Sequence, residues 1–252
     1  MRELAEIAAR AVQAAPACRF ADRRDAAVQF VPAETATAQS LLVCLCGLDG
    51  RIGMPLNLFH RWLVGLPAHV LYLRDPANAS FTEGIAELGE GPAAMAIFVR
   101  HLAATLGTRH LAIYGNSMGG FAAAKLGARA AAQRIVVAGG IARVRTSGER
   151  KPPTIDELEA ARQSACAEIQ ELLRQAETVP EIVSVFSTGI RRDTADAQAL
   201  AGLGCVRLMP VERGLHNVAT ELARSGSLGP LLAWLVGRGD VKNLIAPSPA
   251  QA

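Results

Sequence analysis

The chain has 252 residues, of which 50% are hydrophobic and 19% are charged, so it can bury a large core, and extensive disorder is excluded. The 26 basic and 23 acidic residues leave a net charge of +3, and only 4% of residues are aromatic, which offers little basis for a nucleic-acid surface. We expect one α/β domain over 1–252, a length that such domains often reach.

The beginning of the chain, 1–15, mixes charged and apolar residues like an amphipathic helix and lacks the unbroken apolar run of a signal peptide. Apolar runs such as Leu41–Leu48 are much shorter than the roughly 20 residues that cross a bilayer. Five cysteines are an odd number, and Cys44 and Cys46 alternate within one apolar run, where neither can bridge the other. These features predict a soluble, cytoplasmic protein without a membrane span.

Short, continuously apolar runs recur along the chain, a pattern typical of strands that are covered on both faces. They are 41–46, 69–73, 110–114, 135–138, 182–186 and 206–209. Helical patterns occupy 55–64, 92–106, 118–132, 194–203 and 217–225. This alternation predicts a mainly parallel sheet of six or more strands with helices on both faces.

One segment, 141–180, does not follow this alternation of strands and helices. Thr154 and Glu157 have the spacing of a capping box, and apolar residues then recur every three or four positions as far as Ala176. We expect this helix to be a small cap insertion beside or over the site. The tail, 240–252, contains two prolines and few large apolar residues, so we expect it to be loose.

The strongest functional signal is the pentapeptide from Gly115 to Gly119, with Ser117 at its centre. It follows the predicted strand 110–114 and precedes a helix rich in glycine and alanine. A nucleophile on a sharp strand-to-helix turn needs small neighbours two residues away on each side, because larger side chains would collide. Ser117 is therefore the predicted nucleophile, placed at a helix N-terminus that favours developing negative charge.

With this motif in its context, the chain resembles the α/β-hydrolase superfamily over roughly 28–237. The resemblance implies the chain order of nucleophile, acid and histidine, found here as Ser117, Asp193 or Asp196, and His216. It also implies an oxyanion loop after the first predicted strand, here 46–51, in which the backbone N–H groups of Leu48 and Met118 form the hole. Cys46 stands where many members of the superfamily have a histidine, and the subfamily stays open.

His216 is the predicted general base because it follows the last predicted strand, at the carboxyl edge where parallel sheets form their sites. The other histidines are less suitable: His60 and His101 fall in helical patterns, and His69 and His110 stand at strand beginnings.

Two aspartates follow the strand 182–186. We expect Asp193 to orient His216 from a loop, and Asp196 to lie in the first turn of a helix that starts near Ala195. Either residue could instead cap that helix.

The sequence gives no sign of a metal or cofactor site. Cys44 and Cys46 have no partnering metal motif, 47–53 lacks the phosphate-loop sequence, and 115–120 lacks the dinucleotide-binding pattern. Arginines at four loop positions, Arg143, Arg145, Arg191 and Arg192, should border the site, where they either bind an anionic substrate group or are solvated.

The predicted function is that of a cofactor-free serine hydrolase that cleaves a small-molecule carboxylic ester or thioester through an acyl-enzyme on Ser117. The alternatives are an acyltransferase with the same triad and a non-catalytic binding protein that retains the fold. The acyl chain, the leaving group and the oligomeric state stay open.

Overall fold

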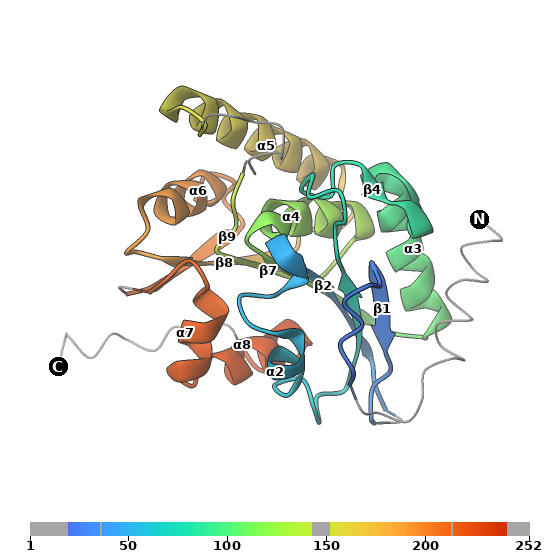
Figure 1. Ribbon diagram of the computed structural model, residues 1–252. Coiled ribbons are helices and arrows are strands. Elements are labelled where there is room, and N and C mark those ends of the chain that lie inside the picture. Colours follow the sequence, from blue (N-terminus) through green and yellow to red (C-terminus); the bar gives the residue numbers. More distant parts are fainter. Residues whose placement is uncertain (1–19, 36, 143–151, 213, 241–252) are drawn as a thin grey trace.

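A computed structural model describes residues 20–35, 37–142, 152–212 and 214–240. Its main sheet has seven strands in the order β1-β3-β2-β6-β7-β8-β9, and all neighbouring strands are parallel except β1, which is antiparallel to β3 (Figure 1). The strands are β1 (Val28–Val31), β2 (Ser40–Leu45), β3 (Ala68–Leu73), β6 (His110–Asn116), β7 (Arg134–Ala138), β8 (Glu181–Ser187) and β9 (Val206–Val211). The predicted α/β fold with a mainly parallel sheet is confirmed.

Helices cover both faces of the sheet (Figure 1). One layer contains α3 (Gly91–Thr105), α4 (Met118–Ala130), α5 (Ile155–Gln175) and α6 (Arg191–Ala201). The opposite layer contains α2 (Leu56–His60), α7 (Val218–Arg224) and α8 (Leu228–Leu235). Two short 3-10 turns, η1 (Leu48–Gly50) and η2 (Ala86–Leu88), and a small hairpin of β4 (Gly84–Ile85) with β5 (Gly89–Glu90) complete the described elements.

The central strand β2 illustrates why the apolar runs form this sheet. Every residue from Ser40 to Leu45 is buried. Leu41, Val43 and Leu45 belong to the core under α3 and α4, whereas Leu42 and Cys44 belong to the core on the opposite face. Successive side chains of a strand point to opposite faces, so a strand with two covered faces is apolar at nearly every position.

The sequence analysis missed two elements and misplaced the start of a third. The prediction had no strand at Val28–Val31 and no helix at Leu228–Leu235, and it began the helix of Asp196 near Ala195 although α6 begins at Arg191. β1 has only four residues, and α8 is apolar on nearly every side, so neither shows a clear period.

The helix expected as a cap is α5, and its position corrects that expectation. It connects the neighbouring strands β7 and β8 and packs beside α4 and α6. Its buried apolar residues Ala165, Ile169 and Leu173 join the core of that face. The apolar stripe is thus satisfied by the layer around α4, and the capping box of Thr154 and Glu157 is present as predicted.

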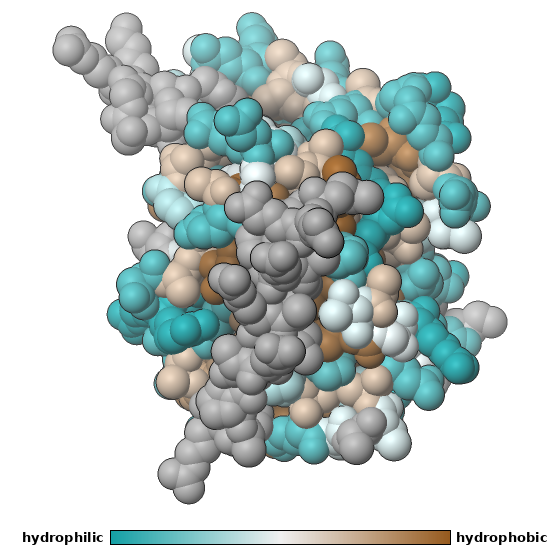
Figure 2. Space-filling model, turned by 90° about the vertical axis from the view of Figure 1, so that its right-hand side faces the viewer, coloured by the Kyte–Doolittle hydropathy of each residue, from teal (hydrophilic) through white to brown (hydrophobic). Residues whose placement is uncertain are grey.

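The remaining expectations on termini fall largely outside the described residues, since 1–19 and 241–252 are not among them. Within the described ranges, no helix combines the length and apolar character that crossing a membrane requires. On the face around α3 and β1, polar surface surrounds smaller apolar areas (Figure 2).

Candidate active site

Ser117 occupies a strained turn between β6 and α4. Its backbone angles, φ 50° and ψ −113°, lie where L-residues are rarely found. The turn is held on both sides, because the Ser117 N–H donates to the Ala138 carbonyl at 2.9 Å and the Ile141 N–H donates to the Ser117 carbonyl at 3.1 Å. Surrounding structure therefore fixes a backbone conformation that projects the Ser117 side chain from the carboxyl edge of the sheet.

The flanking glycines, Gly115 and Gly119, are required because a side chain would collide with neighbouring atoms, and not because of their backbone angles. A Cβ at Gly115 would lie 2.3 Å from the Gly119 carbonyl oxygen and 2.4 Å from the Ala123 Cβ. A Cβ at Gly119 would lie 2.6 Å from the Leu45 carbonyl oxygen. β6 thus approaches α4 too closely for a side chain at Gly115, and α4 approaches the end of β2 too closely for one at Gly119, as the motif predicts.

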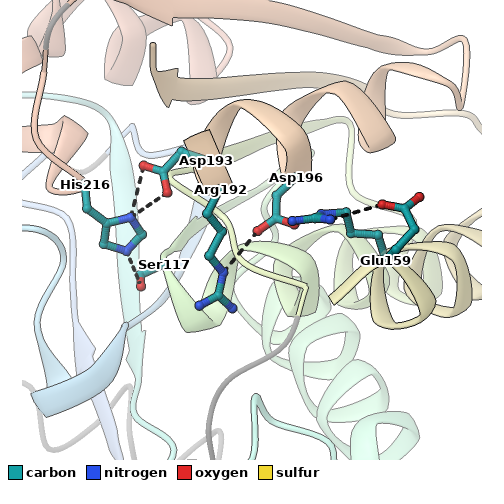
Figure 3. Close-up of polar contacts among 7 residues, drawn as sticks. Ser117, Glu159, Arg192, Asp193, Asp196 and His216 are labelled. Atoms are coloured by element: carbon teal, nitrogen blue, oxygen red, sulfur yellow. Dashed lines mark hydrogen bonds and ion pairs between the residues drawn. The ribbon is translucent and has the colours of Figure 1, made fainter. Parts of the chain in front are cut away.

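Three predicted residues form one continuous hydrogen-bonded chain (Figure 3). The Ser117 Oγ lies 2.7 Å from the His216 Nε2. The His216 Nδ1 lies 2.9 Å from Oδ1 and 3.1 Å from Oδ2 of Asp193. Asp193 is almost fully buried, whereas the His216 side chain is 37% exposed. The arrangement can pass a proton from the serine hydroxyl to the imidazole while a carboxylate fixes the orientation of the ring.

The loop that carries His216 is held in place by its neighbours on β8 and β7. The buried Ser187 hydroxyl, at the end of β8, donates a hydrogen bond to the Gly214 carbonyl. The Val218 N–H returns to the His216 carbonyl at 2.9 Å. Gly139, at the end of β7, leaves room for this loop, because a Cβ there would lie 2.8 Å from the His216 carbonyl oxygen. Sequence analysis did not single out Ser187, whose role depends on a partner 27 residues away.

Asp196, the alternative acid, has different partners. Its Oδ1 lies 2.6 Å from the Arg162 Nε, and its Oδ2 lies 3.7 Å from the Arg192 Nε (Figure 3). Burial raises the pKa of Asp196, in spite of the opposing effect of the Arg162 guanidinium. Both aspartates lie on α6, so the expected placement of Asp193 in a loop was wrong, but its carboxylate is the one that reaches His216.

The predicted oxyanion donors lie beside Ser117. Met118 is the first residue of α4 and Leu48 the first of η1. The N–H groups in the first turn of a helix have no acceptor within that helix, so they are suited to bind an anion. A Cβ on Gly47 would lie 3.2 Å from the Ser117 Cβ, which shows how closely the Leu48 loop passes the serine. A hydrogen bond of 2.7 Å from the Gly47 N–H to the Arg51 carbonyl closes that loop.

Asn116 is a neighbour of the site that the sequence analysis did not single out. It is buried, and its Oδ1 has no hydrogen-bond partner among the described residues. Its side-chain amide lies close to Gly47 and Gly53. A Cβ added to Gly47 would lie 2.8 Å from the Asn116 Nδ2, and one added to Gly53 would lie 3.2 Å from the Asn116 Oδ1. Asn116 therefore packs between the nucleophile strand and the oxyanion loop.

The competing histidines are engaged elsewhere. The His60 Nδ1 lies 2.9 Å from the Tyr72 hydroxyl, the His69 Nδ1 accepts from the Ala33 N–H, and the His110 Nε2 contacts the Leu235 carbonyl. The remaining histidine, His101, lies within α3 as its pattern predicted.

Other chemistry-bearing groups give no second site in the described part of the chain. No cluster of three or more His, Cys, Asp or Glu residues there could hold a metal ion. Burial raises the pKa of Cys46 to about 12, which makes a poor ligand and nucleophile of its thiol. Arg192 is paired with Asp196, and Arg143 and Arg145 lie outside the described residues.

The sheet order, the two helical layers and the strand–turn–helix around Ser117 define an α/β-hydrolase fold. No protein-family model and no curated protein sequence matches the chain. Solved structures do. An S-formylglutathione hydrolase from Staphylococcus aureus is similar at a TM-score of 0.55 and 11% identity, covering 83% of this chain and 90% of that one.

Two further structures show the same fold. An α/β hydrolase fold protein from Nakamurella multipartita has a TM-score of 0.54 and 14% identity, covering 83% of this chain and 94% of that one. A thermophilic esterase from Thermogutta terrifontis has a TM-score of 0.52 and 16% identity, covering 89% of this chain and 96% of that one. The predicted resemblance to α/β hydrolases is thereby confirmed at the level of the fold.

Proposed function

We propose that this protein is a serine hydrolase that cleaves a carboxylic ester or thioester through an acyl-enzyme on Ser117. The observation that carries the proposal is the unbroken chain from Ser117 Oγ to His216 Nε2 at 2.7 Å and from His216 Nδ1 to Asp193 at 2.9 Å. A structural serine needs no imidazole at its hydroxyl and no buried carboxylate behind that imidazole. Similarity in fold to an esterase and to an S-formylglutathione hydrolase supports the same chemistry.

In the acylation half, Ser117 Oγ attacks the substrate carbonyl carbon while its proton moves to His216 Nε2. The carbonyl oxygen becomes an oxyanion, which the Met118 and Leu48 N–H groups stabilise. The bond to the leaving group then breaks, and the imidazolium returns the proton to the departing alcohol or thiol. Asp193 stays ionised throughout and stabilises the imidazolium.

In the deacylation half, His216 takes a proton from water as the water oxygen attacks the acyl carbon. A second oxyanion forms in the same hole. Its collapse breaks the bond to Ser117 Oγ, which recovers the proton from His216, and the carboxylic acid leaves. No step needs a metal or an organic cofactor.

Covalent labelling tests the proposal. A fluorophosphonate probe should label the purified protein, and Ser117→Ala should abolish both the label and the hydrolysis of p-nitrophenyl esters and acyl thioesters. A label without any turnover in water, but with turnover once an acceptor alcohol or thiol is added, would identify an acyltransferase instead. Absence of both label and turnover in the folded protein would overturn the proposal in favour of a binding protein.

A further inference from the structure

A cavity of about 280 Å³ is lined by residues of β2, α3, α4 and α5 and of the loops at 80–82 and 141–142. Ile141, one of its lining residues, donates its N–H to the Ser117 carbonyl. Leu45, another, precedes the oxyanion loop and contacts the helix at Gly119. The lining of the cavity therefore includes one residue hydrogen-bonded to Ser117 and the residue before the oxyanion loop.

From there the cavity follows α4 away from the nucleophile. Phe121, Ala122, Lys125 and Leu126 line it, four to nine positions after Ser117. At 1.5 Å of rise per helical residue, Lys125 lies about 12 Å further along the axis than Ser117. An acyl chain that runs from Ser117 to the Lys125 end of the cavity therefore has to be extended over about this distance.

Most residues in the wall of the cavity are apolar, and its polar ones are Ser80, Thr82, Lys125 and Glu168. The larger apolar residues come from β2, α3, α4, the loop before β4 and the loop after β7: Leu45, Phe81, Met95, Phe121, Leu126 and Ile141. At the far end, the Lys125 Nζ lies 2.5 Å from Glu168 on α5, which also contacts Arg129. Glu168 offsets one of the two positive charges, so this end of the cavity is polar and marks where the apolar part of the wall stops.

The position of His216 determines which part of a substrate the cavity can take. His216 must protonate the leaving group, so that group has to lie on the side of the imidazole. Among the described residues, none that lines the cavity belongs to the segment 187–196 or 214–217, which carry Asp193 and His216. The part of the substrate directed away from His216 is the acyl group.

We infer that this cavity binds an unbranched, apolar acyl chain of medium length, and that Ala122 and Met95 set the length. The inference rests on the proposed function and names its substrate class. At about 30 Å³ for each water-sized group, 280 Å³ holds roughly nine methylene-sized groups. Acyl groups of about eight carbons fit, and longer chains meet the Lys125–Glu168 pair.

A chain-length series tests the inference. We expect kcat/KM for p-nitrophenyl esters to rise by up to about fourfold for each added methylene, and to level off or fall beyond about eight to ten carbons. Ala122→Leu, which fills the cavity, should move the optimum to shorter chains. Met95→Ala, which enlarges it, should move the optimum to longer ones. Opposite shifts cannot both arise from a general loss of stability.

Ala104→Leu is the matched control, because Ala104 is exposed on α3 and does not line this cavity. It should leave the chain-length optimum where it is. If hydrolysis proceeds but its rate is flat with chain length, or if neither cavity variant moves the optimum, the inference is wrong and the proposed function stands.

A binding measurement tests the cavity independently of hydrolysis. Calorimetric titration of sodium octanoate into Ser117→Ala should show binding, and adding Ala122→Leu should weaken it at least about tenfold. If no ester is cleaved but octanoate binds in this way, the proposed function fails while the acyl cavity stands. If octanoate does not bind and no chain-length preference exists, the cavity has been misassigned.

Discussion

Asp193 and Asp196 lie three residues apart on α6, yet their carboxylates have different partners. Asp193 contacts the His216 Nδ1 at 2.9 Å, whereas Asp196 pairs with the Arg162 Nε at 2.6 Å (Figure 3). Both carboxylates are almost completely buried. Because they share a helix, a residue type and burial, they form a matched pair in which a catalytic and a structural acid can be compared directly.

We therefore expect Asp193→Asn to affect mainly catalysis and Asp196→Asn to affect mainly stability. Asp193→Asn should lower kcat by about ten-thousandfold, since an amide favours the wrong imidazole tautomer, with a smaller change in stability. Asp196→Asn should keep kcat within about threefold but lower the free energy of unfolding by about 2 kcal/mol, because Arg162 loses its buried counter-charge. Steady-state kinetics and urea denaturation of both variants measure the contrast.

The reverse pattern, with catalysis lost in Asp196→Asn, would exclude Asp193 as the orienting residue. Equal losses in both variants would show that α6 shifts as a unit and that neither aspartate acts on His216 alone.

Sequence pattern was sufficient where local composition decides the structure. The apolar run 41–46 could be recognised as a doubly covered strand from its residues alone, and the structure has it as β2, Ser40–Leu45. The Gly–Ser–Gly turn could be recognised from its spacing. The cap expectation for α5 went wrong because an amphipathic stripe gives a buried face but not its partner, which is α4 in the structure. Which helix a stripe covers depends on strand order, and that is a long-range property.

Part of the candidate active site could also be predicted from the sequence. Ser117 and His216 follow from their places after strands, and the structure brings them together. Asp193 was expected for a partly mistaken reason, because the start of α6 lies four residues earlier than the apolar period suggests. The supporting contacts of Ser187 and Asn116 could not be foreseen, since each joins segments far apart in the chain.

Ser117 itself offers a test of backbone strain. Ser117→Ala and Ser117→Gly should both lack activity, because the nucleophile is gone. At φ 50° and ψ −113°, however, glycine is less strained than alanine, so Ser117→Gly should be the more stable variant by about 1 kcal/mol. Guanidinium denaturation of the two variants compares them, and equal stability would show that the turn relaxes without cost.

Gly47 tests the contact between the oxyanion loop and the nucleophile. Its backbone, at φ −79°, suits any residue, but an alanine Cβ would lie 2.8 Å from the Asn116 Nδ2 and 3.2 Å from the Ser117 Cβ. Gly47→Ala should therefore displace the loop and lower kcat by about a hundredfold, the cost of weakening one oxyanion donor, with a smaller change in KM.

The control for Gly47→Ala is Gly202→Ala at the end of α6. Gly202 has φ −60°, and outside the two adjacent residues the nearest atom to a new Cβ is the Ala199 carbonyl oxygen at 3.3 Å. This variant should retain full activity. If Gly47→Ala is equally active, the loop does not depend on the close approach seen here, and Leu48 is not a required oxyanion donor.

The three histidines held away from the site predict how stability changes with pH. Burial lowers the pKa of His60, His69 and His110 below the ordinary histidine value. The lowered pKa of His69 agrees with its contact, since its Nδ1 accepts the Ala33 N–H and must be unprotonated to do so. In the unfolded chain these rings regain an ordinary pKa of about 6.5. At mildly acidic pH the unfolded chain therefore binds more protons than the folded one, and the free energy of unfolding falls as pH falls.

The stabilisation from the neutral histidines is present above about pH 6.5 and is lost as the pH drops through their folded pKa values. We expect the Tm to fall between about pH 7.5 and about pH 5.5, before most carboxylates titrate. The fall should be smaller in His60→Gln, which removes one of the three rings, and unchanged in the control His101→Gln, whose side chain takes no part in the three contacts described for these rings. Calorimetric scans at both pH values give the comparison.

A Tm that rises on acidification, or an identical fall in wild type and His60→Gln, would show that the buried His60 ring does not control stability in this range.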